Sequence, residues 1–270
     1  MIVRTTYREE SPELAAAGTE SLRASFARIK GFSDDWFHEL SIEPDSPIGQ
    51  VDRWARVQPL STQLINLVVS ARDHVRMIAN YVEQPSLGVP TLAAYTLTRT
   101  SIEASSLGIW LVTPGTLNKR LLRSLCLAWH NESDVEDWAR QVGVGEIAAL
   151  SDLRGRLLTE RDARAPLRQH QLDKFPTWTS IVRESESHVP VNPALTPLAA
   201  WKAASGFAHS NLTTIQSFLE HEISDDESGR THHRMTSRFS TVAMFLRTAL
   251  DHLDGLTSLI EHSAKSGRCL

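Results

Sequence analysis

The chain of 270 residues has little cysteine and no strong charge of either sign. Its two cysteines, Cys126 and Cys269, are too few for a disulfide framework or a cysteine-based metal site, which predicts a reducing, cytoplasmic compartment. The formal net charge of −4 provides no global attraction to nucleic acid or to an anionic membrane. Any binding of RNA therefore requires a local basic patch.

Segments that would direct the chain to a membrane are also missing. Residues 1–14 lack the apolar core of a secretory signal peptide. The most hydrophobic stretch, residues 92–112, approaches the length of a membrane span but contains Arg99 and Glu103. Because each such charge costs about 2.5–3.5 kcal/mol at the centre of a bilayer, we expect a core helix here and no membrane partner.

The common motifs of nucleotide and hydrolase chemistry do not occur. The sequence contains no Walker A loop, no G-x-G-x-x-G, no G-x-S-x-G elbow and no HExxH zinc motif. Residue types that bind metals gather in residues 220–233, but their spacing matches no known metal motif. We therefore expect a solvated polar loop there, no metal site and no cofactor.

Apolar residues recur with helical spacing almost throughout, and no alternating run bounded by hairpin turns is evident. The sequence predicts an all-α protein, an up-and-down bundle of about six long helices over residues 60–270. An N-terminal arm, residues 1–59, precedes it with one helix and an irregular segment in which Trp36 and Trp54 are the expected anchors. The predicted helices cover residues 11–30, 61–83, 90–112, 116–142, 146–163, 177–187, 194–223 and 237–263.

Polar residues interrupt the apolar faces of two predicted helices. In each helix three of them are spaced i, i+4 and i+8, which places them on one face. The flanking sequences are too apolar for solvated helices, so these groups are expected to be buried, at a cost unless they find partners. The two sets are Tyr95, Arg99 and Glu103 on one helix and Trp201, Ser205 and His209 on the other.

Three interpretations of these sets are open. In the first, both helices line an internal pocket that binds or transforms a small molecule, with His209 as an acid or base. In the second, the sets meet as one buried network that fixes helix packing. In the third, which extends the second, the protein is a non-catalytic scaffold or interaction module. These interpretations do not decide whether the protein is an enzyme.

Several of these positions resemble a known group of proteins. The group consists of uncharacterised bacterial helical proteins that are similar to HEPN-like domains, many of which are ribonucleases of toxin and defence systems or nucleotide-binding modules. This resemblance implies RNA or a nucleotide as partner, and a homodimer. The positions are Arg99-Thr100-Ser101-Ile102-Glu103, Trp110-Leu111, Arg120, Arg123 and the Trp201-x3-Ser205-x3-His209 element.

The resemblance also implies a catalytic pair, an arginine followed after four to six residues by a histidine, which promotes attack by an RNA 2′-hydroxyl. Arg123 with His130 and Arg247 with His252 fit this pattern, and a polar residue follows each arginine. Since about three such pairs are expected by chance in a chain rich in arginine, spacing alone does not choose between them. Arg123 and His130 are the preferred pair, and His209 belongs to the resemblance without matching this pattern.

Overall fold

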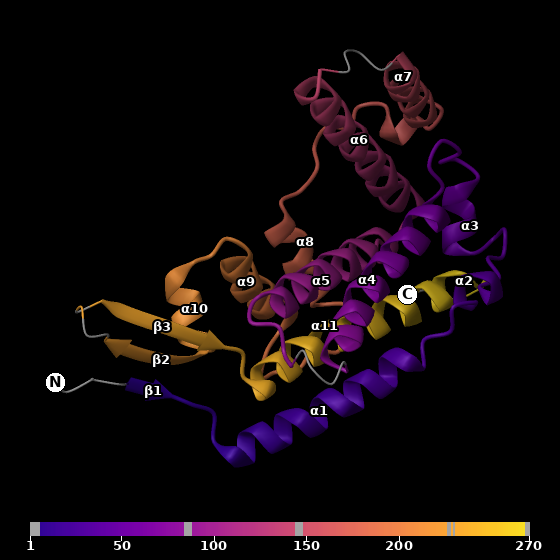
Figure 1. The fold of residues 1–270 in the computed structure, drawn as a ribbon. Helices are drawn as coiled ribbons and strands as arrows, with labels where there is room; N and C mark the ends of the chain where they lie inside the picture. The colour runs from indigo at the N-terminus through magenta and orange to yellow at the C-terminus, as the bar shows by residue number, and fades with distance from the viewer. Residues whose placement is uncertain (1–5, 84–87, 144–147, 226–227, 229, 268–270) are drawn as a thin grey trace. The chain divides into compact units, whose positions relative to one another are not determined.

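The computed structural model describes residues 6–83, 88–143, 148–225, 228 and 230–267. Within these residues the protein is predominantly helical, with eleven α-helices and one three-stranded sheet (Figure 1). The all-α prediction is therefore confirmed. In this part of the chain, no helix combines the length and the apolar character that crossing a bilayer requires.

Apart from the one over residues 194–223, the predicted long helices form close to their expected bounds. The side chains of Ser11, Thr116 and Thr177 begin α1, α6 and α8 by accepting a hydrogen bond from the backbone of the first turn. The helices are α1 (Pro12–Lys30), α2 (Trp36–Glu39), α3 (Pro47–Asp52), α4 (Leu60–Val82), α5 (Ala93–Val112), α6 (Leu117–Gln141), α7 (Ala148–Asp162), α8 (Trp178–Ser185), α9 (Pro197–Ala208), α10 (Leu212–Phe218) and α11 (Phe239–Ser263), with a 3-10 turn at Ala165–Leu167.

The segment predicted as a polar loop before the last helix is instead a β-hairpin. Strands β2 (Glu220–Asp225) and β3 (Thr231–Thr236) pair antiparallel, and β1 (Thr6–Arg8) adds to the other edge of β2. The prediction was wrong because the two hairpin strands contain only Ile223 and Met235 as aliphatic residues, which leaves no apolar alternation to recognise.

The helix predicted over residues 194–223 is also wrong, because it is broken in the middle. α9 ends at Ala208, Ser210 adopts a left-handed conformation with φ of 53°, and the Asn211 side chain then caps α10. The chain folds back tightly there: a Cβ on Gly206 would lie 2.4 Å from Oγ1 of Thr214. The turn residues interrupt the helix although the apolar period continues across them.

Short helices also occur in the segment predicted to be irregular, residues 31–59, where α2 and α3 form. The chain divides into two compact units. Unit 1 comprises residues 1–33, 69–105 and 189–254, and unit 2 comprises residues 34–68, 106–188 and 255–270. Helices α4, α5 and α11 contribute residues to both units. The division between an arm and a bundle at residue 59 stays a prediction.

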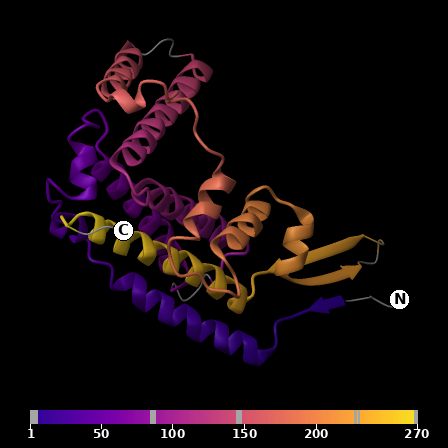
Figure 2. The same cartoon turned by 180° about the vertical axis from the view of Figure 1, so that it is seen from behind.

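In unit 1, α1 packs closely on the beginning of α11 (Figure 2). A Cβ on Gly18 would lie 2.3 Å from the backbone nitrogen of Ser240, so only glycine permits this approach. The carboxylate of Glu10 accepts hydrogen bonds from the backbone N–H groups of Phe239 and Ser240, at 3.0 and 3.1 Å. The segment before α1 therefore caps α11.

In unit 2, both predicted tryptophan anchors make defined contacts. The indole of Trp36 donates a hydrogen bond to Glu261 at 2.8 Å. The guanidinium of Arg164 lies over the ring of Trp54, 4.6 Å from its centroid. The core of the unit is aliphatic, with fully buried Ile48, Val51, Leu60, Leu64, Ile109, Leu111, Leu121 and Ile181.

Candidate functional site

Four of the six residues on the two polar stripes meet in unit 1. Arg99 donates to Oε1 of Glu103 at 2.7 Å, one turn along α5, and to the hydroxyl of Ser205 on α9 at 2.9 Å. The indole of Trp201 donates to the same Glu103 oxygen at 2.8 Å. Of the three open interpretations, these contacts support one polar network shared by the two helices, formed by these four residues.

This network satisfies its own groups. The Arg99 and Glu103 side chains are 25% and 15% exposed, and Ser205 also donates to the carbonyl of Trp201 at 2.8 Å. The guanidinium lies 5.7 Å from the centre of the Trp201 ring. A half-buried ion pair with two further hydrogen bonds holds α5 against α9, which is the arrangement expected of a packing network.

Tyr95 lies outside this network. Its ring is fully buried, stacked on Phe207 at 4.0 Å between centroids and edge-on to Phe245 at 5.0 Å. Burial raises the pKa of its hydroxyl to about 12, against smaller opposing effects of Ser237 and Arg238. The expectation that Tyr95 joins the polar stripe is wrong, because its ring completes an aromatic core.

His209 also departs from its expected place. It is the C-cap residue of α9 and is exposed, because the helix ends at Ala208, one residue before His209. The expected burial of His209 beside Arg99 and Glu103 is therefore wrong.

Replacing Glu103 by glutamine tests the packing role. We expect Glu103→Gln to lower the free energy of unfolding by about 1–3 kcal/mol, because Arg99 loses its charged partner in a half-buried place. The matched control is Glu20→Gln, whose carboxylate lies 3.7 Å from Arg23 on the surface and is expected to change stability by less than about 0.5 kcal/mol. Urea unfolding measures both, and equal effects would contradict the assignment.

Arg123 and His130, the preferred catalytic pair, are both half-buried in unit 2 and touch one group of rings. We call this group the aromatic cluster: Trp110, His130, Phe175 and Trp178. The guanidinium of Arg123 lies over Trp110, 4.6 Å from the ring centroid, and donates to the Trp110 carbonyl at 2.5 Å. Its other nitrogen donates to Glu184 on α8 at 2.7 Å. Arg123 therefore joins α5, α6 and α8 within the unit.

The other three rings of the cluster each contact Phe175. His130 stacks on Phe175, with centroids 4.3 Å apart and planes 8° from parallel. Phe175 meets Trp110 and Trp178 edge-on, at 5.7 and 6.2 Å. Trp178 is 36% exposed and the His130 side chain is 32% exposed, so part of the aromatic cluster faces solvent. An aromatic surface of this kind can stack a planar ligand.

Sequence reasoning missed Phe175 and Trp178. Both lie in KFPTWT, the short run that leads into α8, where Thr177 caps the helix. The aromatic residues around a proline are the only local signal. Their contact with α6 joins segments that are far apart in the sequence, which a periodicity analysis does not detect.

Two further predicted cations are unavailable to a ligand. Arg120 is 8% exposed and donates to the carbonyl of Pro114 at 2.6 Å, so its guanidinium is not presented to a phosphate at the surface. His252, of the alternative catalytic pair, is 1% exposed in the core of unit 1, and burial lowers its pKa to about 3. A histidine in this position cannot reach an RNA substrate.

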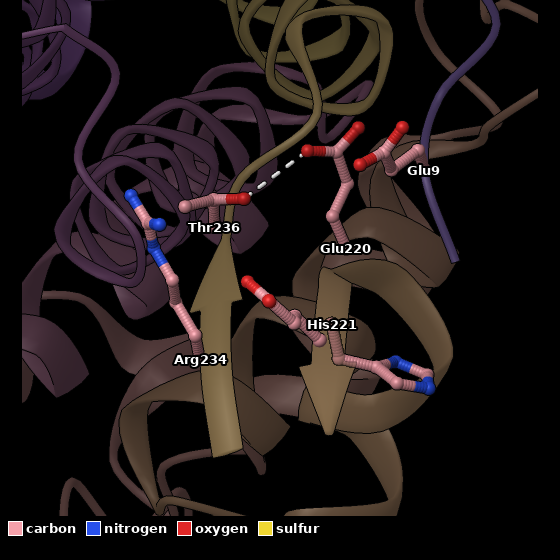
Figure 3. A pocket seen from close by; sticks show the side chains of 6 residues that line it. Glu9, Glu220, His221, Arg234 and Thr236 are labelled. Carbon is pink, nitrogen blue, oxygen red and sulfur yellow. Dashed lines mark hydrogen bonds between the residues drawn. The ribbon is translucent and has the colours of Figure 1, made fainter. Parts of the chain in front are cut away.

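A third group of polar side chains lies on the sheet of unit 1. Figure 3 shows the carboxylates of Glu9 and Glu220 beside each other and the hydroxyl of Thr236 donating to Glu220, while Arg234 and His221 point to opposite sides. These residues line an open pocket of about 240 Å³. Among the described residues, no group of three histidine, cysteine or acidic side chains is placed to hold a metal ion.

Comparison of the chain with protein-family models, with curated proteins and with solved structures finds no match. The candidate sites therefore rest on geometry alone: a self-satisfied network in unit 1, and a partly exposed aromatic cluster with an arginine and a histidine in unit 2.

Proposed function

We propose that unit 2 binds single-stranded RNA or a nucleotide at the aromatic cluster, in keeping with the HEPN-like resemblance. The observation that carries the proposal is the stacked pair of His130 and Phe175, continued by Trp178 toward solvent. Single-stranded nucleic acids bind to exposed aromatic rings because the face of each unpaired base stacks on the face of a ring.

Two features that favour phosphate lie next to Phe175 and Trp178. Lys174 is exposed and precedes Phe175 directly. The first turn of α8 follows it at Trp178, and helix N-termini favour anions through their free N–H groups and the helix dipole. These local features are needed because the whole chain carries a net charge of −4.

Binding is better supported than cleavage by the position of Arg123. Its guanidinium is held by Glu184 and by the Trp110 carbonyl, so it positions the rings instead of facing solvent. Cleavage by Arg123 and His130 would require Arg123 to leave Glu184 for the scissile phosphate. The same preparation distinguishes the two activities, because cleavage yields shortened RNA and binding alone does not.

The test is fluorescence anisotropy with a labelled single-stranded oligoribonucleotide at low salt. We expect Trp178→Ala to weaken binding about tenfold or more, since stacking of one base contributes about 1–3 kcal/mol. Trp138→Ala is the matched control, because Trp138 is 58% exposed on α6 outside the cluster and should leave affinity unchanged. Absence of binding at low salt, or equal effects of the two variants, would refute the proposal.

A further inference from the structure

A pocket in unit 2 is lined by carboxamide and apolar side chains. It encloses about 400 Å³ between the first half of α4, α6 and the residue Leu107 of α5. All eight lining residues are uncharged. Four of them carry carboxamides: Gln58, Gln63, Asn66 and Asn131. The other four are a threonine and three leucines.

Two of the carboxamides are held in fixed orientations. Gln63 is 6% exposed; its nitrogen donates to the carbonyl of Ser124 at 3.1 Å, and its oxygen accepts from the Ser124 hydroxyl at 3.1 Å. The nitrogen of Gln58 donates to the buried carboxylate of Glu132 at 3.0 Å. Since the nitrogen of Gln58 is turned to Glu132, its oxygen is left as an acceptor for a ligand.

The other two carboxamides retain their donors and acceptors. Asn66 and Asn131 are exposed at the mouth of the pocket, one on α4 and one on α6. Within the described residues, neither side chain forms a hydrogen bond to another protein group. Each therefore offers one oxygen acceptor and an NH2 donor side by side.

Beside Gln63, the buried part of the pocket is lined by leucines. Leu107 and Leu127 are each 4% exposed and both belong to its lining. An uncharged lining does not compensate the lost hydration of an ionic ligand, which favours a neutral one. The leucines and the carboxamides together fit a flat molecule that has hydrogen-bond donors and acceptors along its edge.

We propose that this carboxamide pocket binds a neutral nucleobase. Asparagine and glutamine form paired hydrogen bonds with adjacent donor and acceptor atoms of a base edge, as they do with adenine. A sugar is disfavoured because the pocket has neither an aromatic ring to stack on nor a carboxylate to accept from several hydroxyls. The inference goes beyond the proposed function, since it involves none of the residues of the aromatic cluster.

The experiment is a ligand-observed NMR titration of the full chain with adenosine, cytidine and glucose at millimolar concentrations. We expect saturable binding of adenosine, and affinity about tenfold lower in Asn66→Leu and in Asn131→Leu. Asn80→Leu is the matched control, because Asn80 is also exposed on α4 but lies outside the pocket. Its affinity should equal that of the unaltered chain.

The inference would be overturned by no saturable binding of either nucleoside, or by binding that the Asn66 and Asn131 variants do not weaken. Glucose binding as strong as that of adenosine would also overturn it, because the pocket would then recognise hydroxyls. The titration is repeated with Trp178→Ala, which should still bind adenosine here. Loss of RNA binding in that variant with retained adenosine binding separates this pocket from the aromatic cluster.

Discussion

Tyr95→Ala is expected to lower the free energy of unfolding by about 3–5 kcal/mol, the largest effect of any substitution considered. The ring is fully buried and contacts both Phe207 and Phe245, so its removal leaves a cavity and ends two aromatic contacts. Because domains are typically stable by only about 5–15 kcal/mol, this loss removes a large share of the total. Thermal and urea unfolding measure it.

Tyr95→Phe is the control for this prediction. It keeps the ring and removes the hydroxyl, so we expect stability within about 1 kcal/mol of the unaltered chain. If Tyr95→Phe were as destabilising as Tyr95→Ala, the hydroxyl would dominate, and the assignment of Tyr95 to an aromatic core would be wrong. The comparison thus decides between the packing role and the polar role that its spacing first predicted.

The second large effect is a dependence of stability on pH that originates at His252. Burial lowers the pKa of this imidazole to about 3, whereas the unfolded chain has the usual value of about 6.5. Between these values the unfolded state binds more protons than the folded state, so stability is complete above pH 6.5 and decreases as pH falls. The loss between pH 7 and pH 5 is expected to be about 2 kcal/mol.

His252→Gln removes the titrating group and should reduce the stability lost between pH 7 and pH 5 by about that amount. His188→Gln provides the control, because His188 is exposed and should leave the pH dependence unchanged. If His252→Gln fails to fold, an NMR titration of the imidazole resonances of the unaltered chain measures the pKa of His252 directly. Titration of His252 with a midpoint near pH 6.5 would contradict the prediction.

The sequence predicts the helices well because their signals are local. Apolar residues with helical spacing and caps such as Thr116 lie within a few positions of each other. The hairpin and the break at Ser210 are not predicted, because neither has a strong local signal in the sequence. Polar strands carry little alternation, and a single left-handed residue does not change the hydrophobic period.

The candidate sites are predictable to different extents. Spacing places Arg99 with Glu103, and Trp201 with Ser205, on one face of each helix, and the cost of burial indicates that they need partners. That the two helices meet is set by tertiary packing. The aromatic cluster cannot be predicted from spacing, because stacking of His130 on Phe175 joins α6 to the run that leads into α8, a relation also set by tertiary packing. The carboxamide pocket likewise has no local signature.

The cap that Glu10 provides to α11 has a consequence for synthesis of the chain. The hydrogen bond from Phe239 to this carboxylate spans 229 positions, and unit 2 is closed by a similar long contact between Trp36 and Glu261. Both units include part of α11, so neither is complete until that helix has been translated. The apolar faces that pack on α11 therefore stay uncovered until that helix leaves the ribosome, and chaperones can bind them during this interval.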